Sequence, residues 1–366
     1  MRTLSAITSS IFLGFALSCS KPDVSKEPQP VPIDFETDYG VELTAGDITS
    51  INIPSFGVVA AVEYSGGGFL SADASLADFM KDIPVRKDKS GSWKADPTHY
   101  WPLIPEHTVS FFAYAPLAAG TSAVGNWDDR SVTVTCVPDQ NPSKHTDLCV
   151  AVPVLDRVGY DPVPLEFHHT LSRMSFSANF IGDLPMNNGV PICYLRIDEL
   201  SLINIHGSNS MTVVPNPPAG EPAFSWDDFG QDAVKNARYD LSIGNLTLGE
   251  GAIPQQSGDN FKEFVTAGGY VYMLPQTINP VGADVKTVMD VMFSYVKNDN
   301  QGTVMAQFQI REVLPDNIVL MPATKYNLRF TIDITNASMA DIHCESTGWI
   351  NEWTDSYNPS TDHIIK

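Results

Sequence analysis

The sequence is poor in charge and in long apolar runs, and each shortage excludes a class of protein. Only 18% of its 366 residues are charged, while 43% are hydrophobic. This balance is typical of a packed globular protein and not of a disordered one. After residue 20 no stretch holds 18 uninterrupted apolar residues, so the sequence predicts no membrane-spanning helix beyond that point.

Basic residues are scarcer still. The chain has 22 Lys and Arg against 43 Asp and Glu, a formal net charge of −21. Binding to nucleic acid depends on neutralising phosphates with positive charge, so nucleic acid is excluded as the expected partner. An acidic surface instead favours solubility and mutual repulsion between molecules.

Motifs for chemistry are also missing. The five cysteines form no C-x-x-C pair, and there is no G-x-S-x-G nucleophile turn. Glu166 and His168 fall on one face of a predicted strand and His169 on the other, so a three-ligand site would need a ligand from elsewhere and a structural role is predicted. The sequence therefore predicts no catalytic residues, no cofactor and no metal site.

The N-terminus carries a strong targeting pattern. Arg2, an apolar run over residues 7–17 and the small-residue sequence before Cys19 are typical of a lipoprotein signal peptide covering residues 1–18. The alternative is cleavage by the ordinary signal peptidase, with Cys19 incidental. Acylation of Cys19 would anchor the chain to a membrane leaflet without spanning it. Residues 19–30, with three prolines, read as an extended tether.

The rest of the chain favours β-structure. Apolar residues alternate along residues 165–180, the period of a strand with one buried face, and 25 Gly and 27 Pro predict many turns between short elements. We expect an all-β protein of two tandem sandwiches, over residues 31–187 and 188–366. The first strand lies directly after the tether, and its inward residues are Ile33, Phe35, Val41 and Leu43.

Two further side-chain groups have candidate roles. Cys136 ends one strand-like segment and Cys149 opens the next, so a hairpin disulfide is predicted for an exported protein. Trp93, Tyr100 and Trp101 form an aromatic group that could stack on sugar rings, which makes a surface glycan-binding lipoprotein the rival function. The alternative is that these aromatics plug the end of a core.

Blocks of sequence spread over nearly the whole mature chain resemble the fimbrillin (Mfa-like) family. They are residues 101–102 (WP) with 110–116 (SFFAYAP), 165–176 (LEFHHTLSRMSF), 272–276 (YMLPQ) and 321–328 (MPATKYNL). The resemblance implies two transthyretin-like β-sandwiches and a subunit of type V pili, a surface-exposed lipoprotein of the outer membrane that assembles with other pilin subunits and contacts host or bacterial receptors.

The family also implies a mechanism. A trypsin-like or arginine-specific protease removes the lipidated first strand, and a C-terminal donor strand from the next subunit fills the vacated groove. The present sequence departs from that pattern, since it holds no Lys or Arg between Lys26 and Lys81. Cutting at Lys81 or Arg86 would also remove the central strand predicted at residues 56–62.

The departure predicts a subunit that keeps its first strand and its lipid, as the anchor at a pilus base does. Residues 356–366 are a candidate donor segment, and the alternative is a frayed terminus. A stalk or tip subunit processed by a protease of other specificity stays open.

Overall fold

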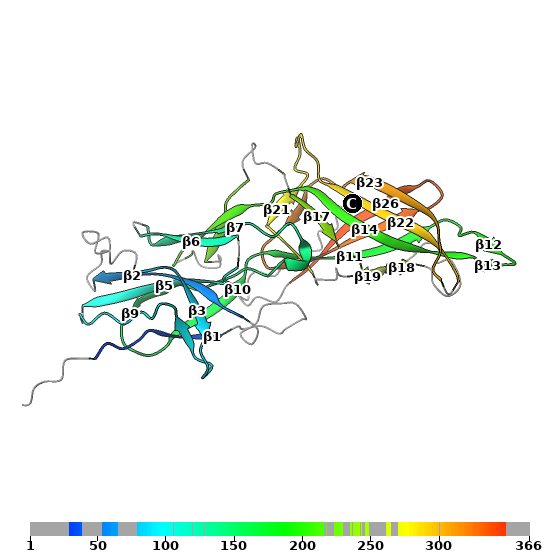
Figure 1. Cartoon of the computed structure of the whole chain (residues 1–366). Helices are drawn as coiled ribbons and strands as arrows, with labels where there is room; N and C mark the ends of the chain where they lie inside the picture. Colours follow the sequence, from blue (N-terminus) through cyan, green and yellow to red (C-terminus); the bar gives the residue numbers. More distant parts are fainter. Residues whose placement is uncertain are drawn as a thin grey trace, which may run out of the picture.

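The computed structural model describes residues 29–38, 53–64 and 79–348, apart from short gaps at 105, 119, 128, 216, 218–222, 230–234, 236, 242, 244–245, 249–260, 265–269 and 300. Within these residues the regular structure is β-strand, apart from one 3₁₀ turn, η1 (Pro142–Lys144). The predicted all-β class is therefore confirmed. Among the described residues no helix is long and apolar enough to cross a membrane. The molecule is elongated, with early strands at one end and late strands at the other (Figure 1).

Eight strands form the first sheet, and their pairing closes on itself. Its order is β2-β3-β4-β1-β10-β8-β5-β9, and β2 pairs in addition with β5. The path from β2 through β1 and back to β5 is thus a closed ring of seven strands, which we call the ring. Its strands are β1 (Asp34–Asp38), β2 (Phe56–Tyr64), β3 (Met80–Lys87), β4 (Trp93–Ala95), β5 (His107–Ala115), β8 (Cys149–Ala151) and β10 (Val163–His169), with β9 (Val154–Arg157) beside β5.

A smaller sheet covers one outer face of the ring. It has the order β16-β15-β7-β6, and buries Val134, Met211 and Phe224 against Val59 of β2 and Phe112 of β5. Because alternate residues of β2 and β5 face the ring interior and this second layer, both strands read as continuous apolar runs. The strands are β6 (Thr121–Asn126), β7 (Ser131–Cys136), β15 (Asn209–Val213) and β16 (Phe224–Trp226).

The other half is a sandwich of two sheets, with orders β19-β11-β25-β26 and β17-β14-β22-β23; β20 also pairs with β11, and β18 with β14. One continuous apolar cluster joins the two sheets. The first sheet holds β11 (Ser172–Ile181), β19 (Lys262–Phe264), β20 (Val271–Met273), β25 (Thr324–Asp333) and β26 (Ser338–Gly348). The second holds β14 (Cys193–Ile205), β17 (Ala237–Leu241), β18 (Leu246–Leu248), β22 (Val288–Lys297) and β23 (Val304–Val313). Two small pairs complete the fold, β12 (Met186–Asn187) with β13 (Val190–Pro191), and β21 (Gln276–Ile278) with β24 (Ile318–Leu320).

The stretch predicted as one strand over residues 165–180 is two strands. β10 belongs to the ring and β11 to the far sandwich. At the break, the Thr170 amide donates to Leu148 O at 2.9 Å and Leu171 is buried in the second layer. The alternation continues across the break because both strands bury one face, in different cores.

Strands from one side of the boundary predicted between residues 187 and 188 pair with strands from the other side. β11 precedes it and pairs with β25, whereas β15 follows it and pairs with β7. The assignment of two sandwich domains at that boundary stays a prediction. Along the described residues, the chain enters the far sandwich at β11, returns to the sheet that covers the ring at β15, and enters the far sandwich a second time at β17.

Candidate functional site

The first strand occupies a defined position between β4 and β10. β1 pairs in parallel with β10, with Phe35 opposite Val163, and antiparallel with β4, with Phe35 opposite Trp93. Further backbone hydrogen bonds extend this pairing, from Ile33 N to His99 O and from Trp101 N to Val31 O, both at 2.9 Å. We call this position, flanked by β4 and β10, the first-strand seat.

Two side chains of this segment point into the ring. Ile33 is 1% exposed and Phe35 is 4% exposed. The Phe35 ring lies edge-on to Phe56 of β2 and to Phe111 of β5, with centroid separations of 5.8 and 5.9 Å. The seat is therefore filled both by backbone pairing and by side chains that complete the core. This confirms the inward orientation predicted for Ile33 and Phe35, while Val41 and Leu43 lie outside the described residues.

Polar side-chain contacts also join β1 to β4. Asp34 forms an ion pair with Lys94 of β4, with Oδ1 and Nζ 2.5 Å apart, and the indole Nε1 of Trp93 donates to Thr37 Oγ1 at 3.2 Å. A shallow cleft of about 350 Å³ lies alongside, lined by Asp34, Glu36, Lys87 and Pro162 among others. These contacts fix the register of β1 against β4.

The nearest basic residues after Lys26 lie in β3. Lys81 and Arg86 are exposed, but β3 pairs with both β2 and β4. Cutting there would separate β2 from the rest of the ring, and β2 pairs with β5 from Gly57 to Tyr64 and contributes Phe56, Val58, Ala60 and Val62 to the core. The central position predicted for residues 56–62 is confirmed. Cys19 and residues 356–366 lie outside the described residues.

The three aromatics considered for sugar stacking are not a surface group. Trp93 and Trp101 are 5% and 3% exposed and belong to the ring core, and only Tyr100, at 46%, reaches solvent. Trp93 packs on Phe56 at 5.0 Å and Trp101 on Phe111 at 5.8 Å between ring centroids. Trp93 and Trp101 do not offer a surface for sugar stacking, because both indoles are used in closing the ring, as the alternative of aromatics plugging a core predicts.

The disulfide predicted between Cys136 and Cys149 is not formed in the structure, where both are buried and neither belongs to a disulfide. The reason is that the two cysteines lie in different sheets and in different cores. Cys149 faces the ring core, whereas Cys136 packs in the second layer. Burial raises the pKa of the Cys136 thiol to about 12, so this side chain remains protonated and unreactive.

The sequence correctly separates Glu166 and His168 from His169. His168 Nε2 lies 3.3 Å from Glu166 Oε1, and His169 contacts Asp147 and Cys149 instead. The group formed by Asp147, Cys149 and His169 was missed. Its signal in the sequence is an Asp two residues before a Cys at the start of a strand, but the pairing of that strand with residue 169 is needed to recognise it.

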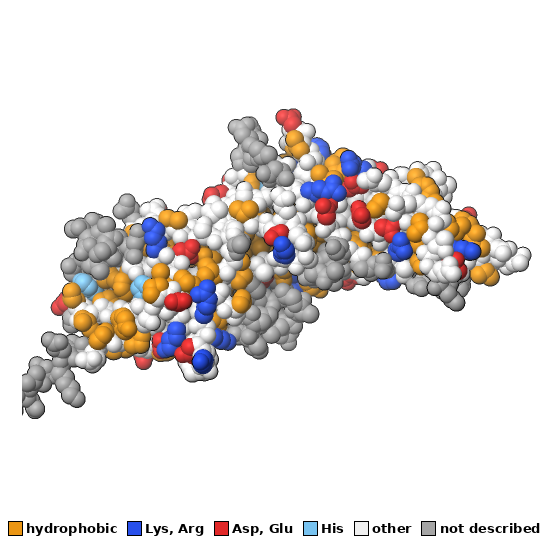
Figure 2. All heavy atoms as spheres, in the orientation of Figure 1, with side chains coloured by type: hydrophobic (Ala, Val, Ile, Leu, Met, Phe, Trp, Pro, Cys, Tyr) orange, Lys and Arg blue, Asp and Glu red, His pale blue; other side chains and the backbone are white. Residues whose placement is uncertain are grey.

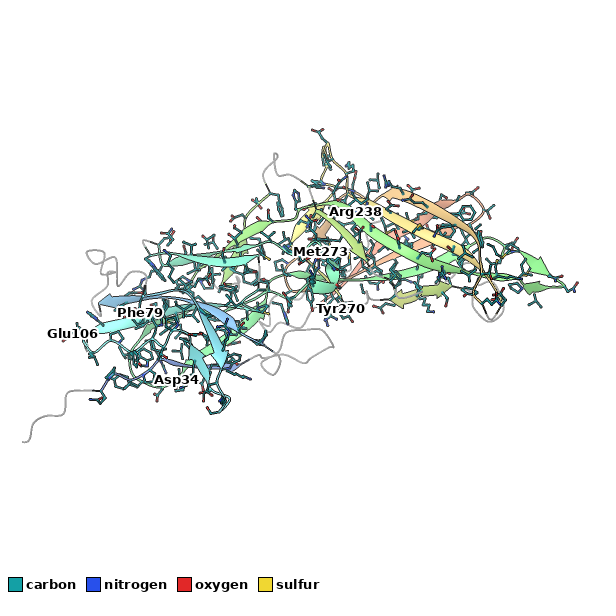
Figure 3. The ribbon with its side chains drawn as sticks, in the orientation of Figure 1. Asp34, Phe79, Glu106, Arg238, Tyr270 and Met273 are labelled. Carbon is teal, nitrogen blue, oxygen red and sulfur yellow. The ribbon has the colours of Figure 1, made fainter. Side chains whose placement is uncertain are left out.

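A polar cleft of about 460 Å³ lies on the far sandwich, over β11, β25 and β26. The Arg173 guanidinium sits 3.5 Å from the centroid of the Tyr270 ring, and that of Arg329 sits 4.2 Å from Phe261. Asp34 and Tyr270, labelled in Figure 3, mark the first-strand seat and this cleft. Elsewhere on the face seen in Figure 2, acidic and basic side chains are interspersed. Glu263 and Glu345 also line the cleft, so it combines cations, carboxylates and aromatic rings, groups that suit a sugar-like ligand.

No family model and no curated protein sequence matches the chain. Among solved structures, a fimbrial protein from Bacteroides vulgatus superimposes with a TM-score of 0.56 and 16% identity, covering 87% of this chain and 99% of that one. The chain has the fold of that fimbrial protein. Candidate cell adhesion proteins from Bacteroides uniformis and Bacteroides ovatus match with TM-scores of 0.45 and 0.43, at 15% and 14% identity over 88% of this chain. A fold shared with a fimbrial protein is what the resemblance to fimbrillins predicts.

Proposed function

We propose that this chain is a structural and adhesive subunit of a type V pilus that retains its own first strand and joins other subunits by strand complementation. The observation that carries the proposal is the first-strand seat. β1 is the strand that closes the ring between β4 and β10, and no Lys or Arg lies between Lys26 and Lys81 where a protease of the family's specificity would release it. In this proposal the ring and the far sandwich are the two transthyretin-like units.

Under this proposal, the chain stands at the base of a pilus or is an accessory subunit. Lipid on Cys19 would hold the chain on the outer membrane at the cell surface, and its C-terminal residues would be available to the next pilin. Its role is assembly and adhesion and not catalysis. Removal of residues 1–18 takes away one Arg and leaves a formal charge of −22, which supports protein and surface receptors as partners over nucleic acid.

The test deletes the first strand and then supplies it as a separate peptide. A chain lacking residues 31–43 should aggregate or bind a synthetic peptide of residues 31–43, because loss of Ile33 and Phe35 opens the ring core to water. The control peptide carries Phe35→Asp, which keeps the backbone but places a charge in the core. If the shortened chain stays monomeric and as stable as the full chain without peptide, the proposal is wrong.

A second measurement addresses the lipid. Intact mass and N-terminal sequencing of protein taken from the cell surface should give a blocked, acylated chain beginning at Cys19. A free N-terminus between residues 44 and 90 would instead identify a processed, polymerising subunit.

Glycan binding is the second candidate function, and the cleft beside Tyr270 is the observation that favours it. Tyr270→Ala should reduce retention on a surface polysaccharide, because stacking and cation–π contacts with Arg173 would be lost. Tyr160, which is 59% exposed and is not among the residues lining the cleft, supplies the control variant Tyr160→Ala. Equal retention of both variants, or no retention of the parent chain, would contradict this function.

A further inference from the structure

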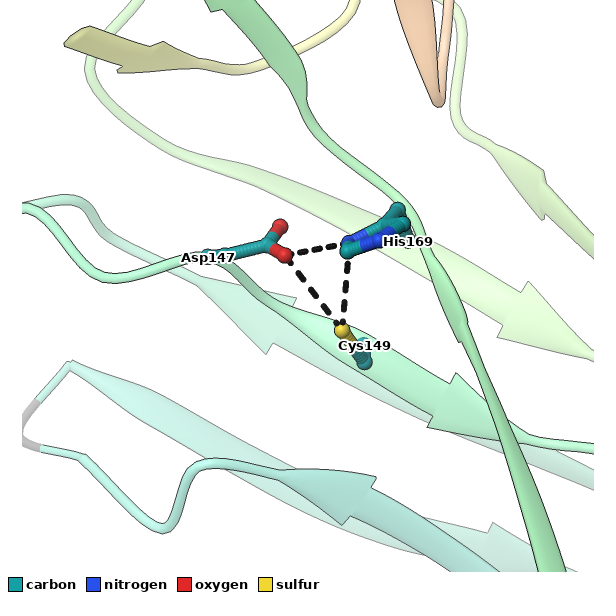
Figure 4. A group of neighbouring side chains, drawn as sticks. All are labelled: Asp147, Cys149 and His169. Atoms are coloured by element: carbon teal, nitrogen blue, oxygen red, sulfur yellow. Dashed lines mark hydrogen bonds and ion pairs between the residues drawn. The ribbon is translucent and has the colours of Figure 1, made fainter. Parts of the chain in front are cut away.

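Three side chains able to bind a metal meet inside the molecule where β8 begins and β10 ends. Figure 4 shows Asp147, Cys149 and His169 converging from these segments. Cys149 and His169 are opposite each other in the antiparallel pair of β8 and β10, and Asp147 stands two residues before Cys149. All three are buried, with exposures of 0% for Asp147 and Cys149 and 4% for His169. We call this group the Asp-Cys-His cluster.

Two of the three distances within the cluster fit the ligand spacing of a zinc site. Cys149 Sγ lies 3.6 Å from His169 Nδ1 and 3.6 Å from Asp147 Oδ2. Zinc bonds of about 2.3 Å to sulfur and 2.0–2.1 Å to nitrogen, at the tetrahedral angle, separate the two ligand atoms by about 3.5 Å. Asp147 Oδ2 and His169 Nδ1 are in direct contact, so an ion would replace their hydrogen bond and move these two atoms apart.

One atom of the cluster lacks the partner that its burial demands. Asp147 Oδ1 is buried and accepts no hydrogen bond, and leaving such an acceptor unsatisfied costs about 1–3 kcal/mol or more when the group is charged. A cation bound by both oxygens of Asp147 would satisfy Oδ1. It would also bring the number of ligand atoms to four, with one nitrogen, one sulfur and two oxygens.

The donor set selects the metal. Thiolate and imidazole favour zinc and similar transition metals, whereas calcium and magnesium take oxygen ligands. A Cys149 thiolate and the Asp147 carboxylate together carry two negative charges, which a divalent cation balances in a site shielded from water. We propose that the Asp-Cys-His cluster is a structural binding site for a zinc-like divalent cation, in contrast to the sequence-based expectation of no metal.

The location gives the ion a role in joining the two halves. Asp147 follows η1, a segment that contacts β17 and β20 of the far half. Just before Asp147, the His145 ring lies edge-on to Tyr239 of β17, with centroids 4.9 Å apart. A metal bound to Asp147 would therefore fix the segment that connects the ring to the far sandwich.

The same geometry argues against a catalytic triad in the cluster. Asp147 Oδ2 and Cys149 Sγ both contact the same imidazole nitrogen, Nδ1 of His169. A relay would require the acid on one ring nitrogen and the nucleophile on the other. With all three groups buried, convergence on one point inside the protein fits an ion better than a substrate.

The experiment measures metal in the full chain purified from cells grown with zinc. We expect one zinc per chain, and cobalt substitution should give a thiolate-to-cobalt absorption band. Cys149→Ser and Asp147→Asn should each weaken zinc binding by about 100-fold or more, since loss of even an outer partner costs 10–100-fold. The matched control is Cys193→Ser, which replaces another buried cysteine, one in the far sandwich, and should retain the zinc and the band.

Two results would overturn the proposal. One is a folded full chain that binds no zinc and gives no thiolate-to-cobalt band. The other is a folded Cys149→Ser or Asp147→Asn variant with undiminished zinc content. If those variants fail to fold, the cobalt band of the unaltered chain and the loss of its thermal stability on chelation, restored by zinc, decide the question.

Discussion

The ring of Phe35 in β1 stands edge-on to the ring of Phe111 in β5, with centroids 5.9 Å apart. β5 lies across the interior of the ring from β1, since the two strands do not pair. This contact therefore joins the first strand to the centre of the core and not only to its neighbours in the sheet. Aromatic pairs of this kind contribute about 0.5–1.5 kcal/mol beyond the area they bury.

Phe35→Ala should destabilise the chain by about 3–5 kcal/mol, the usual cost of truncating a buried Phe. Urea unfolding of the chain measures the change. Glu36→Ala alters the next residue, which is exposed, and should change stability by less than about 0.5 kcal/mol. Similar unfolding midpoints for the two variants would show that β1 does not contribute its side chain to the core.

Thr44→Arg should create the protease site that the natural sequence lacks. Trypsin should then cut directly after the introduced arginine, and the fragment carrying β1 should stay bound until urea is added, because the contacts of the seat do not require a covalent link. Thr44→Gln is the control and should remain uncut there. Immediate release of the fragment in native buffer, detected by gel filtration and mass spectrometry, would contradict a stable seat.

His168→Gln should reduce the sensitivity of the protein to acid. Burial, together with the neighbouring His169, lowers the pKa of His168 to about 4 from its ordinary 6.5. Between these pH values the unfolded chain binds a proton that the native chain does not, so stability falls as the pH falls. The loss is at most about 3 kcal/mol at pH 4.

Urea midpoints measured between pH 7 and pH 4 test this, with the exposed His343→Gln on β26 as the control. The difference in stability between His168→Gln and the parent should shift in favour of the variant as the pH decreases. If the difference in stability between His168→Gln and the parent does not change with pH, groups other than His168 cause the acid sensitivity.

Trp101→Ala should cost about 3–5 kcal/mol, as expected for a large buried aromatic. Its neighbour Tyr100 is 46% exposed, so Tyr100→Ala should have a small effect on stability. Thermal unfolding compares the two variants. A stable Trp101→Ala protein with altered polysaccharide retention would restore the sugar-stacking role that the buried position of this indole argues against.

Much of the fold follows from alternation of apolar residues. Ile33 and Phe35 read as inward residues of a first strand, and residues 56–62 as a central strand, because both signals are local and dense. The strands β15, β16 and β17 cannot be recognised in the same way, since three to five residues are too few to display a period. Met211 and Phe224 are nonetheless buried, because β15 pairs with β7, a strand much earlier in the chain, and β16 pairs with β15.

The candidate sites, too, are predictable from the sequence only where their residues are local. The seat is predictable in outline because its residues are contiguous. The break at Thr170, the burial of Trp93 and Trp101, and the convergence of Asp147 with His169 all depend on which strands become neighbours. The alternation of apolar residues predicts that a residue is buried, but it does not predict in which of several cores the residue lies.

The order of strands in the ring has a kinetic consequence. β1 is synthesised before β4 and long before β10, so its position does not exist until residue 166 has been made. Every new molecule therefore passes through a stage in which its first strand is not yet paired. Under the proposed strand complementation, a strand from a neighbouring molecule competes for the same place at that stage. Attachment to its own chain gives β1 an effective concentration of order millimolar, and a neighbour succeeds only where subunits are gathered at comparable density. Retention of the first strand is then a matter of local concentration as well as of protease specificity.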